Sequence, residues 1–147
     1  MPLNARGREQ AQALADELAA GEALEIVYSS DLSRARETAE IVARRLGVRL
    51  VLDPDLREID VGSRQGRTWN EIDDQPQWDG EPHEAHARRV LEALVRIART
   101  HGNRVLVVTH GGSMRCVHEA AEVKDVSVPN CSVWACTVTN GVFRPIA

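Results

Sequence analysis

The 147-residue chain has no apolar run long enough to span a membrane, and its first residues, MPLNARGREQ, lack the charged and then apolar pattern of a secretion signal. It also has no internal repeat and no low-complexity linker. Its three cysteines, Cys116, Cys131 and Cys136, show no CxxC spacing, which excludes a zinc ribbon and favours free buried thiols over a disulfide framework. These absences predict a cytoplasmic protein with no membrane partner.

Basic residues are neither in excess nor clustered: 18 Lys and Arg stand against 22 Asp and Glu, so the formal charge is −4. No basic stripe is present to follow a phosphodiester backbone, which argues against a nucleic-acid partner. Hydrophobic residues make up 43% of the chain and charged residues 27%, values typical of a soluble globular protein. The length predicts one domain over residues 1–147.

Helical and extended patterns alternate along the chain, which predicts an α/β fold with a mainly parallel sheet. Asn4 is expected to cap the first helix, and a glycine is expected to end each long helix. The expected elements are helices at about 5–20, 32–46 and 81–101, ended by Gly21, Gly47 and Gly102, and strands at 26–28, 48–52 and 104–109.

Three further patterns refine this outline. Arg104–Thr109 is a near-continuous apolar run, which predicts a strand buried on both faces. A capping-box spacing at Thr68–Glu71 predicts a short helix within an otherwise irregular segment. Asn140-Gly141 lies between the extended segments 132–139 and 142–145 and therefore predicts a β-hairpin.

His110 is the first candidate for chemistry, because it directly follows the apolar strand and precedes Gly111 and Gly112. Glycines let backbone N–H groups come close to a ligand, and ligands of parallel sheets gather outside the carboxyl ends of the strands. A helix that begins just beyond would add an N-terminus that attracts anions. The pattern predicts an anion site, and the alternative is a surface histidine at a tight turn.

Two other side chains could complete such a site. Arg34 lies in the first turn of the helix after the strand at 26–28, where its guanidinium could hold phosphate oxygens; the alternative is a solvated helix face. Glu58 lies in the irregular segment after Asp53-Pro54 and could donate a proton to a leaving oxygen. Three other histidines, His83, His86 and His118, lack the partners of a tetrahedral metal site and are expected to face solvent.

Five blocks in this order, PLNARGREQA, YSSDLSRARETAE, LREIDVG, RVLVVTHGG and PNCSV, make the chain similar to the histidine phosphatase superfamily, the phosphoglycerate-mutase-like proteins. The resemblance covers nearly the whole chain. It implies a three-layer α/β/α sandwich with a phosphate pocket at the carboxyl ends of the strands. It also implies that Arg34 binds phosphate, that Glu58 is the general acid, and that His110 is the second active-site histidine, which stabilises the transferring phosphoryl group.

The chain departs from the family pattern at its nucleophile. Family members begin with a strand that ends in Arg-His-Gly and carries the histidine that becomes phosphorylated, and no such triplet occurs in this sequence. The resemblance therefore implies that the first strand is missing, through a misplaced start codon, a chain shortened by design or a gene that has lost it. Two smaller departures are Gly80-Glu81-Pro82, where Gly-Glu-Ser is frequent, and a short connection over HEAAEVKDVSVP.

These observations favour a phosphatase-type or mutase-type protein for a small phosphomonoester, inactive or impaired as this chain. The alternative is a non-catalytic pseudoenzyme that binds a phosphorylated ligand or a protein partner, and a purely structural domain is a third reading. No cofactor is implied, because no group of Asp or Glu residues has the spacing of a magnesium or zinc site. The expected ligand is a small phosphorylated substrate or inorganic phosphate.

Self-association is also expected. In the family likeness the missing strand neighbours the strand before His110, so its loss leaves an apolar strand edge unpaired, which is a template for another chain. Either the C-terminal hairpin moves inward to cover this edge, or a second copy supplies a strand and forms a symmetric homodimer.

Overall fold

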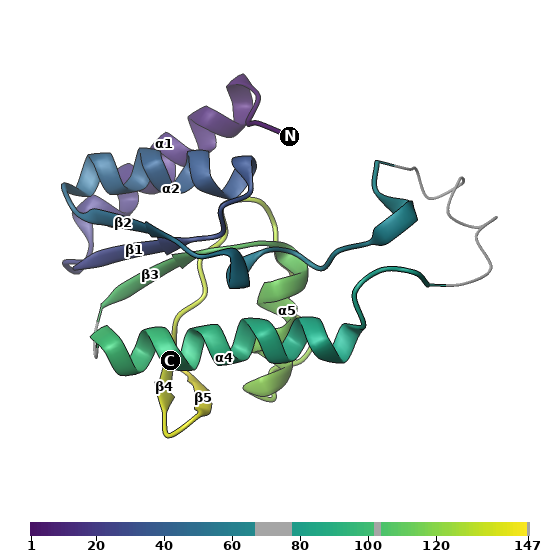
Figure 1. Ribbon diagram of the computed structural model, residues 1–147. Coiled ribbons are helices and arrows are strands. Elements are labelled where there is room, and N and C mark those ends of the chain that lie inside the picture. Colours follow the sequence, from purple (N-terminus) through teal and green to yellow (C-terminus); the bar gives the residue numbers. More distant parts are fainter. Residues whose placement is uncertain (67–77, 102–103, 147) are drawn as a thin grey trace.

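The computed structural model describes residues 1–66, 78–101 and 104–146, and these form helices on both faces of a sheet (Figure 1). Helices α1 and α2 cover one face, and α4 and α5 lie on the other. The expected three-layer α/β/α architecture is therefore confirmed. The elements are α1 (Ala5–Ala20), β1 (Ile26–Ser29), α2 (Ser33–Leu46), β2 (Arg49–Leu52), the 3-10 turns η1 (Pro54–Leu56) and η2 (Gly62–Arg64), α4 (His83–His101), β3 (Val105–Val108), α5 (Gly111–Ala120), β4 (Cys136–Thr139) and β5 (Val142–Pro145).

The main sheet has the order β2-β1-β3 and is parallel throughout, with Val27 opposite Leu50 on one side and Leu106 on the other. All four residues of β1 are buried, because this strand has a neighbour on each side and helices on both faces. The expectation that β3 is buried on both faces is wrong. Each of its four residues is only half-buried, because in the described sheet β3 is an edge strand.

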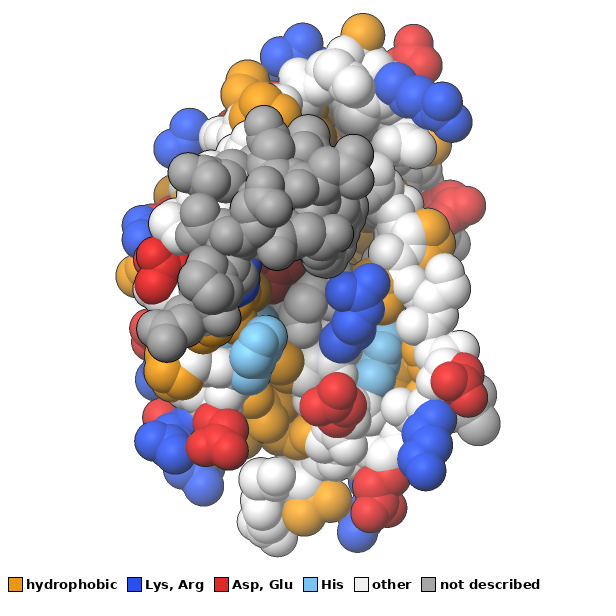
Figure 2. Space-filling model, turned by 90° about the vertical axis from the view of Figure 1, so that its right-hand side faces the viewer, with side chains coloured by type: hydrophobic (Ala, Val, Ile, Leu, Met, Phe, Trp, Pro, Cys, Tyr) orange, Lys and Arg blue, Asp and Glu red, His pale blue; other side chains and the backbone are white. Residues whose placement is uncertain are grey.

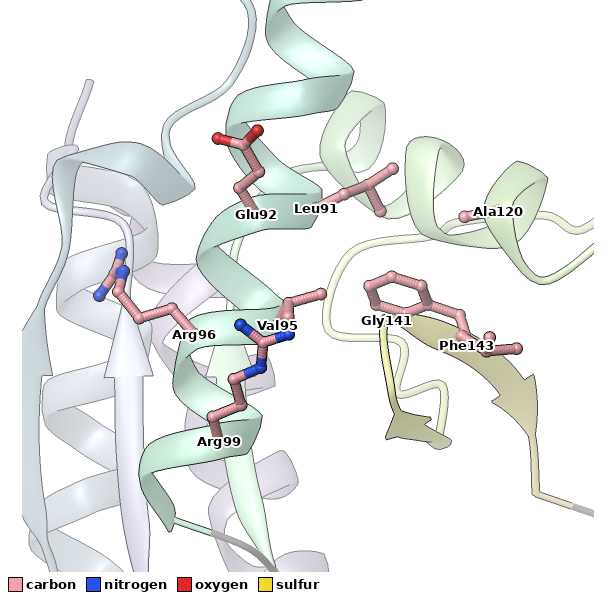
Figure 3. Close-up of a pocket in the computed structure, with 9 residues that line it drawn as sticks. Leu91, Glu92, Val95, Arg96, Arg99, Ala120, Gly141 and Phe143 are labelled. Carbon is pink, nitrogen blue, oxygen red and sulfur yellow. The ribbon is translucent and has the colours of Figure 1, made fainter.

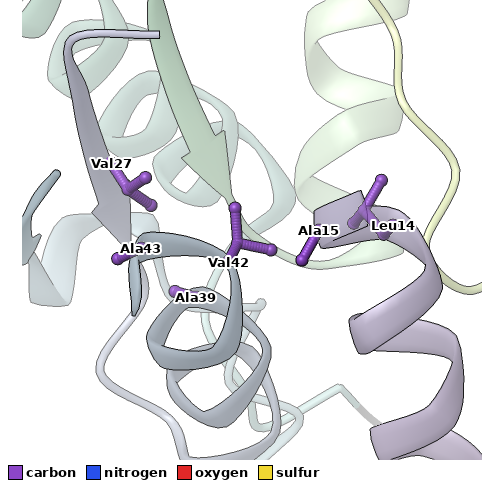
Figure 4. Packing of buried hydrophobic residues seen from close by; sticks show 6 residues of the cluster. All are labelled: Leu14, Ala15, Val27, Ala39, Val42 and Ala43. Atoms are coloured by element: carbon purple, nitrogen blue, oxygen red, sulfur yellow. The ribbon is translucent and has the colours of Figure 1, made fainter. Parts of the chain in front are cut away.

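Local capping explains where the first two helices begin and end. The Asn4 side chain accepts a hydrogen bond of 2.8 Å from the backbone N–H of Gly7, as expected for the cap of α1. Gly47 ends α2 in the left-handed conformation, with φ of 67°, which favours glycine. Helix α2 packs on β1, and α1 packs on α2. The buried members of this apolar layer are Leu14, Ala15, Val27, Ala39, Val42 and Ala43 (Figure 4).

A second apolar layer lies between the sheet and α4, which turns Val90, Ala93 and Ile97 inward. Its buried members are Ile26, Tyr28, Leu56, Ala93 and Ile97. Leu56 in η1 is completely buried there, so the chain just before Glu58 is anchored to the core. Among the described residues, no helix is long and apolar enough to cross a membrane.

The C-terminal hairpin forms as expected, with Asn140 and Gly141 at positive φ in the turn. Its first strand begins at Cys136 rather than at residue 132, since residues 132–135 make no ladder. The hairpin is a separate two-stranded sheet, so the expectation that it moves inward to cover the edge of β3 is wrong. The expected short helix at Thr68–Glu71 and the expected helix end at Gly102 lie outside the described residues.

Candidate functional site

The carboxyl ends of β1 and β3 bring two polar side chains together. Ser30 follows β1 and is completely buried, and His110 lies just after β3 at the residue before α5. The Ser30 hydroxyl and Nε2 of His110 are 2.8 Å apart and form a hydrogen bond. Because parallel strands present their carboxyl ends at one edge, residues that lie 80 positions apart in the sequence meet here. Figure 2 shows this end of the molecule, where histidine side chains lie among side chains of both charges.

Glu58 reaches the same place from the segment after η1. Its Oε2 accepts a hydrogen bond of 2.9 Å from the backbone N–H of Gly112 in the first turn of α5, and its Oε1 accepts one of 3.0 Å from the N–H of Ile59. The fit is close, since a Cβ atom on Gly112 would overlap the Glu58 carboxyl group. A helix N-terminus stabilises a carboxylate, so the fold itself holds Glu58 at this position. In contrast, the space around Gly111 is open within 4 Å.

An ion-paired framework holds the segment that carries Glu58. Arg89 of α4 binds both carboxylate oxygens of Glu81, at 2.9 and 2.8 Å, and donates to the backbone carbonyls of Asp55 and Arg57, at 2.8 and 3.0 Å. One guanidinium thus joins α4 to Glu81 and to the segment just before Glu58. Arg57 itself forms a two-pronged ion pair with Asp31, with both N–O distances at 2.6 Å.

Arg34 is exposed in the first turn of α2. Within the described part of the chain, its guanidinium forms no hydrogen bond or ion pair, whereas Arg36 lies 3.6 Å from Glu40 of the same helix. The pKa of His110 is lowered, chiefly because the ring is partly buried. The Glu58 carboxylate opposes this effect, and the positive charge of Arg34 adds to it. Of the three predicted catalytic side chains, His110 thus feels the charge of both Arg34 and Glu58.

His86 and His118 contradict the expectation that they face solvent: they are only 3% and 4% exposed. Nε2 of His86 is 3.0 Å from the buried Ser113 hydroxyl and 3.6 Å from Oε1 of Glu58. His118 packs edge-on against Trp134. His83 is exposed as expected and stacks on Trp78. We call Ser30, Glu58, His86, His110 and Ser113 the carboxyl-end cluster.

The sequence contains a signal that could have placed His86. It lies four residues before Val90, so it continues the buried stripe of α4 by one helical turn. The polar residues around it hide this continuation. Ser30 and Ser113 carry no comparable signal, because their burial results from contacts between segments far apart in the chain.

A separate hollow of about 500 Å³ lies between α4, the end of α5 and the hairpin (Figure 3). Phe143 of β5 faces Leu91 and Val95 of α4 across it. None of the carboxyl-end cluster lines it. The described residues contain no group of three or more His, Cys, Asp or Glu side chains that could hold a metal ion. The three cysteines are free, as expected, but only half-buried.

Comparison with known proteins identifies the family. The sequence pattern of the Histidine phosphatase superfamily (branch 1) matches residues 1–145. The chain belongs to this superfamily. The resemblance drawn from its sequence blocks is thereby confirmed.

Curated relatives include two that differ in their named activities. A metal-independent phosphoserine phosphatase of Arabidopsis thaliana is 39% identical over 134 residues, covering 79% of this chain and 56% of the relative. A probable phosphoglycerate mutase, GpmB, of Enterobacter sp. is 33% identical over 132 residues, covering 79% of this chain and 61% of the relative. The chain thus spans about three fifths of the length of these relatives.

Solved structures share the fold over most of the chain. YhfR of Bacillus stearothermophilus superimposes with a TM-score of 0.87 at 28% identity, covering 98% of this chain and 82% of YhfR. A mycobacterial glucosyl-3-phosphoglycerate phosphatase, in complex with inorganic phosphate, superimposes with a TM-score of 0.73 at 28% identity, covering 88% of this chain and 72% of that protein.

Proposed function

We propose that the carboxyl end of the parallel sheet binds the phosphoryl group of a small phosphomonoester. In this proposal the Arg34 guanidinium, the His110 imidazole and the backbone N–H of Gly111 hold the phosphate oxygens, and Glu58 protonates the leaving oxygen. The observation that supports it is the arrangement at the start of α5, where His110 bonds to Ser30 and the Glu58 carboxylate bonds to the N–H of Gly112 two residues later. The charges of Arg34 and Glu58 both act on the His110 imidazole. The phosphate complex of the mycobacterial relative is consistent with this ligand class.

These residues would bind the phosphoryl group and protonate the leaving oxygen, but none of them is an acceptor for the phosphoryl group. Covalent transfer needs a nucleophile in line with the leaving oxygen. No Arg-His-Gly triplet occurs in the 147 residues, His86 is buried, and Nε2 of His110 is bonded to Ser30. We propose that this chain by itself binds phosphate without forming a phosphohistidine, and that its turnover is negligible.

The binding step is tested by titrating the protein with inorganic phosphate and following backbone NMR signals. We expect the signals of residues 110–113 to shift, and Arg34→Ala to weaken affinity about tenfold, the effect of losing one charge-assisted contact. Arg36→Ala is the matched control and should leave the affinity unchanged, because Arg36 is engaged by Glu40. Shifts confined to other surface arginines would contradict the proposed site.

The catalytic step is tested with p-nitrophenyl phosphate and small phosphorylated acids near pH 6. We expect no turnover by the 147-residue chain, and turnover by a chain extended with a strand that ends in Arg-His-Gly. A site without its nucleophile can retain about 10³-fold acceleration, which is hard to detect for so slow a reaction. Robust turnover by the short chain, with acid-labile phosphate on His110, would make His110 the nucleophile.

A binding role without chemistry is the second candidate, favoured by the absence of that triplet from the chain. In that role Arg34, His110 and the N–H of Gly111 would hold a phosphorylated small molecule or a phosphorylated protein. Phosphate binding by both the short and the extended chain, with turnover by neither, would select it.

We also propose a homodimer, supported by the half-buried apolar edge strand β3. An edge of this kind can pair with a strand of a second copy. Analytical ultracentrifugation should show a dimer at micromolar concentration, and a clean monomer would remove this proposal.

A further inference from the structure

His86 occupies a place for which the function proposed above provides no role. It belongs to the first turn of α4, it is 3% exposed, and both of its ring nitrogens face α5. Nε2 is 3.0 Å from the Ser113 hydroxyl, and Nδ1 is 3.8 Å from the Cys116 thiol. A buried imidazole with a partner on each nitrogen is fixed in orientation and in tautomer.

The hydrogen bonds determine which nitrogen carries the proton. The Ser113 hydroxyl donates to the backbone carbonyl of Arg57, at 3.4 Å, so its oxygen is left to accept. Nε2 of His86 is therefore the N–H donor, and Nδ1 accepts from the thiol. Burial raises the pKa of Cys116, which keeps that thiol protonated and able to donate.

The nitrogen of His86 that donates to Ser113 also lies near Glu58. Oε1 of Glu58 is 3.6 Å from Nε2, while Oε2 is held by the N–H of Gly112. The carboxyl group thus lies between the imidazole on one side and the start of α5 on the other. We propose that His86 is a positioning residue for Glu58: its buried ring holds the carboxyl group against α5 and is electrostatically coupled to it. This inference rests on the proposed function, because it concerns the proton donor of the same site.

The charges around His86 define the coupling. Burial lowers the pKa of His86, so the ring is neutral at neutral pH, and the Glu58 carboxylate raises this pKa. The other groups that face it are Cys116 from α5, His83 and Arg89 from α4, Glu81 from the preceding segment, and His110 beyond Glu58. When the ring takes up a proton, its positive charge acts on the carboxylate that lies beside it.

The coupling is measured on the 147-residue chain by NMR, without phosphate. In the unsubstituted chain we expect the Glu58 carboxyl ¹³C signal to move over the pH interval in which the His86 ring titrates. Glu58→Gln should lower the pKa of His86 further, because the carboxylate that favours the imidazolium is gone. Glu84→Gln, which removes an exposed carboxylate from the same helical turn, is the matched control and should leave the pKa of His86 unchanged.

A second variant tests the coupling from the other side. In His86→Gln the part of the Glu58 signal movement that comes from the His86 ring should disappear and the part that comes from His110 should stay, whereas in His83→Gln the whole movement should remain. An unchanged His86 titration in Glu58→Gln overturns the proposal, even if His86→Gln does not fold. The proposed function is tested by a different measurement, the titration with phosphate. If the chain bound no phosphate but His86 and Glu58 were still coupled, the phosphate site would be refuted and the positioning role of His86 would stand.

Discussion

The apolar layer under α1 and α2 and the carboxyl-end cluster are built in opposite ways. The apolar layer consists of residues from the three consecutive elements α1, β1 and α2, between positions 14 and 43, and these side chains interact by apolar packing. The carboxyl-end cluster joins residues 30–113 through individual hydrogen bonds, such as those from Gly112 to Glu58 and between Ser30 and His110. Packing tolerates exchange among side chains of similar volume, whereas a buried polar contact depends on a particular atom. Stability and function should therefore respond to different substitutions.

The largest expected effect is a loss of stability that leaves the site intact. Val42 is completely buried in the apolar layer, and Val42→Ala should lower the free energy of unfolding by about 2 kcal/mol through lost burial and the cavity left behind. Urea denaturation measures this. Val133→Ala, at a side chain that is 54% exposed, should change stability by less than about 0.5 kcal/mol. If Val42→Ala weakened phosphate binding as much as Arg34→Ala, the two regions would not be independent.

The same contrast explains what the sequence could predict. The stripe that includes Ala39 and Val42 repeats at helical spacing, and Asn4 and Gly47 mark helix ends, so the helices of the apolar layer follow from local rules. The place of His110 between a strand and a helix was also predictable, because an apolar run followed by a histidine and two glycines is a local pattern.

Long-range features were not accessible in this way. The half-buried state of β3 depends on its position in the sheet rather than on its composition. The contact between His86 and Glu58 requires the crossing of α4 over the segment after η1, which no short stretch of sequence encodes. Polar neighbours made His86 resemble a solvated residue, although Val90 marks the buried face one turn later.

A smaller effect is expected from the framework that holds Glu58. Arg89→Ala removes the guanidinium that bridges Glu81 to the carbonyls of Asp55 and Arg57, and should cost about 1.5 kcal/mol of unfolding free energy. Arg88→Ala, at the exposed neighbouring arginine, is the matched control. Unlike Val42→Ala, Arg89→Ala should also shift the NMR signals of Glu58. Unchanged Glu58 signals would mean that the framework does not position this residue.

The Arg89 contact also carries a pH dependence with a defined sign. The hydrogen bond from Arg89 lowers the pKa of Glu81 in the folded protein. Its contribution to stability is therefore present above the ordinary glutamate pKa of about 4.3 and is lost as the pH falls through the lowered folded value. In Arg89→Ala the loss of stability between about pH 5 and pH 3 should be less steep. An equal slope in both proteins would contradict the assignment.

The smallest effect is expected at two adjacent glycines, Gly111 and Gly112. Comparing their alanine variants separates the effect of helix propensity from the effect of contact with Glu58. Both lie at the start of α5, where alanine favours the helix by up to about 0.5 kcal/mol. Gly111→Ala meets open space and should gain this amount, whereas a Cβ on Gly112 overlaps the Glu58 carboxyl group. Gly112→Ala should therefore be less stable than Gly111→Ala by about 1 kcal/mol, the worth of the hydrogen bond it disrupts.

The two glycine variants should also differ in the titration of His86. Displacing the Glu58 carboxylate removes a charge that raises the pKa of His86, so this pKa should fall further in Gly112→Ala and stay unchanged in Gly111→Ala. Urea denaturation and NMR titration of the ring provide the two measurements. Because alanine adds only a methyl group in each case, a shared response would mean that helix propensity alone determines both variants. A response confined to Gly112→Ala would show that the Glu58 carboxylate can take its position only because residue 112 has no Cβ atom.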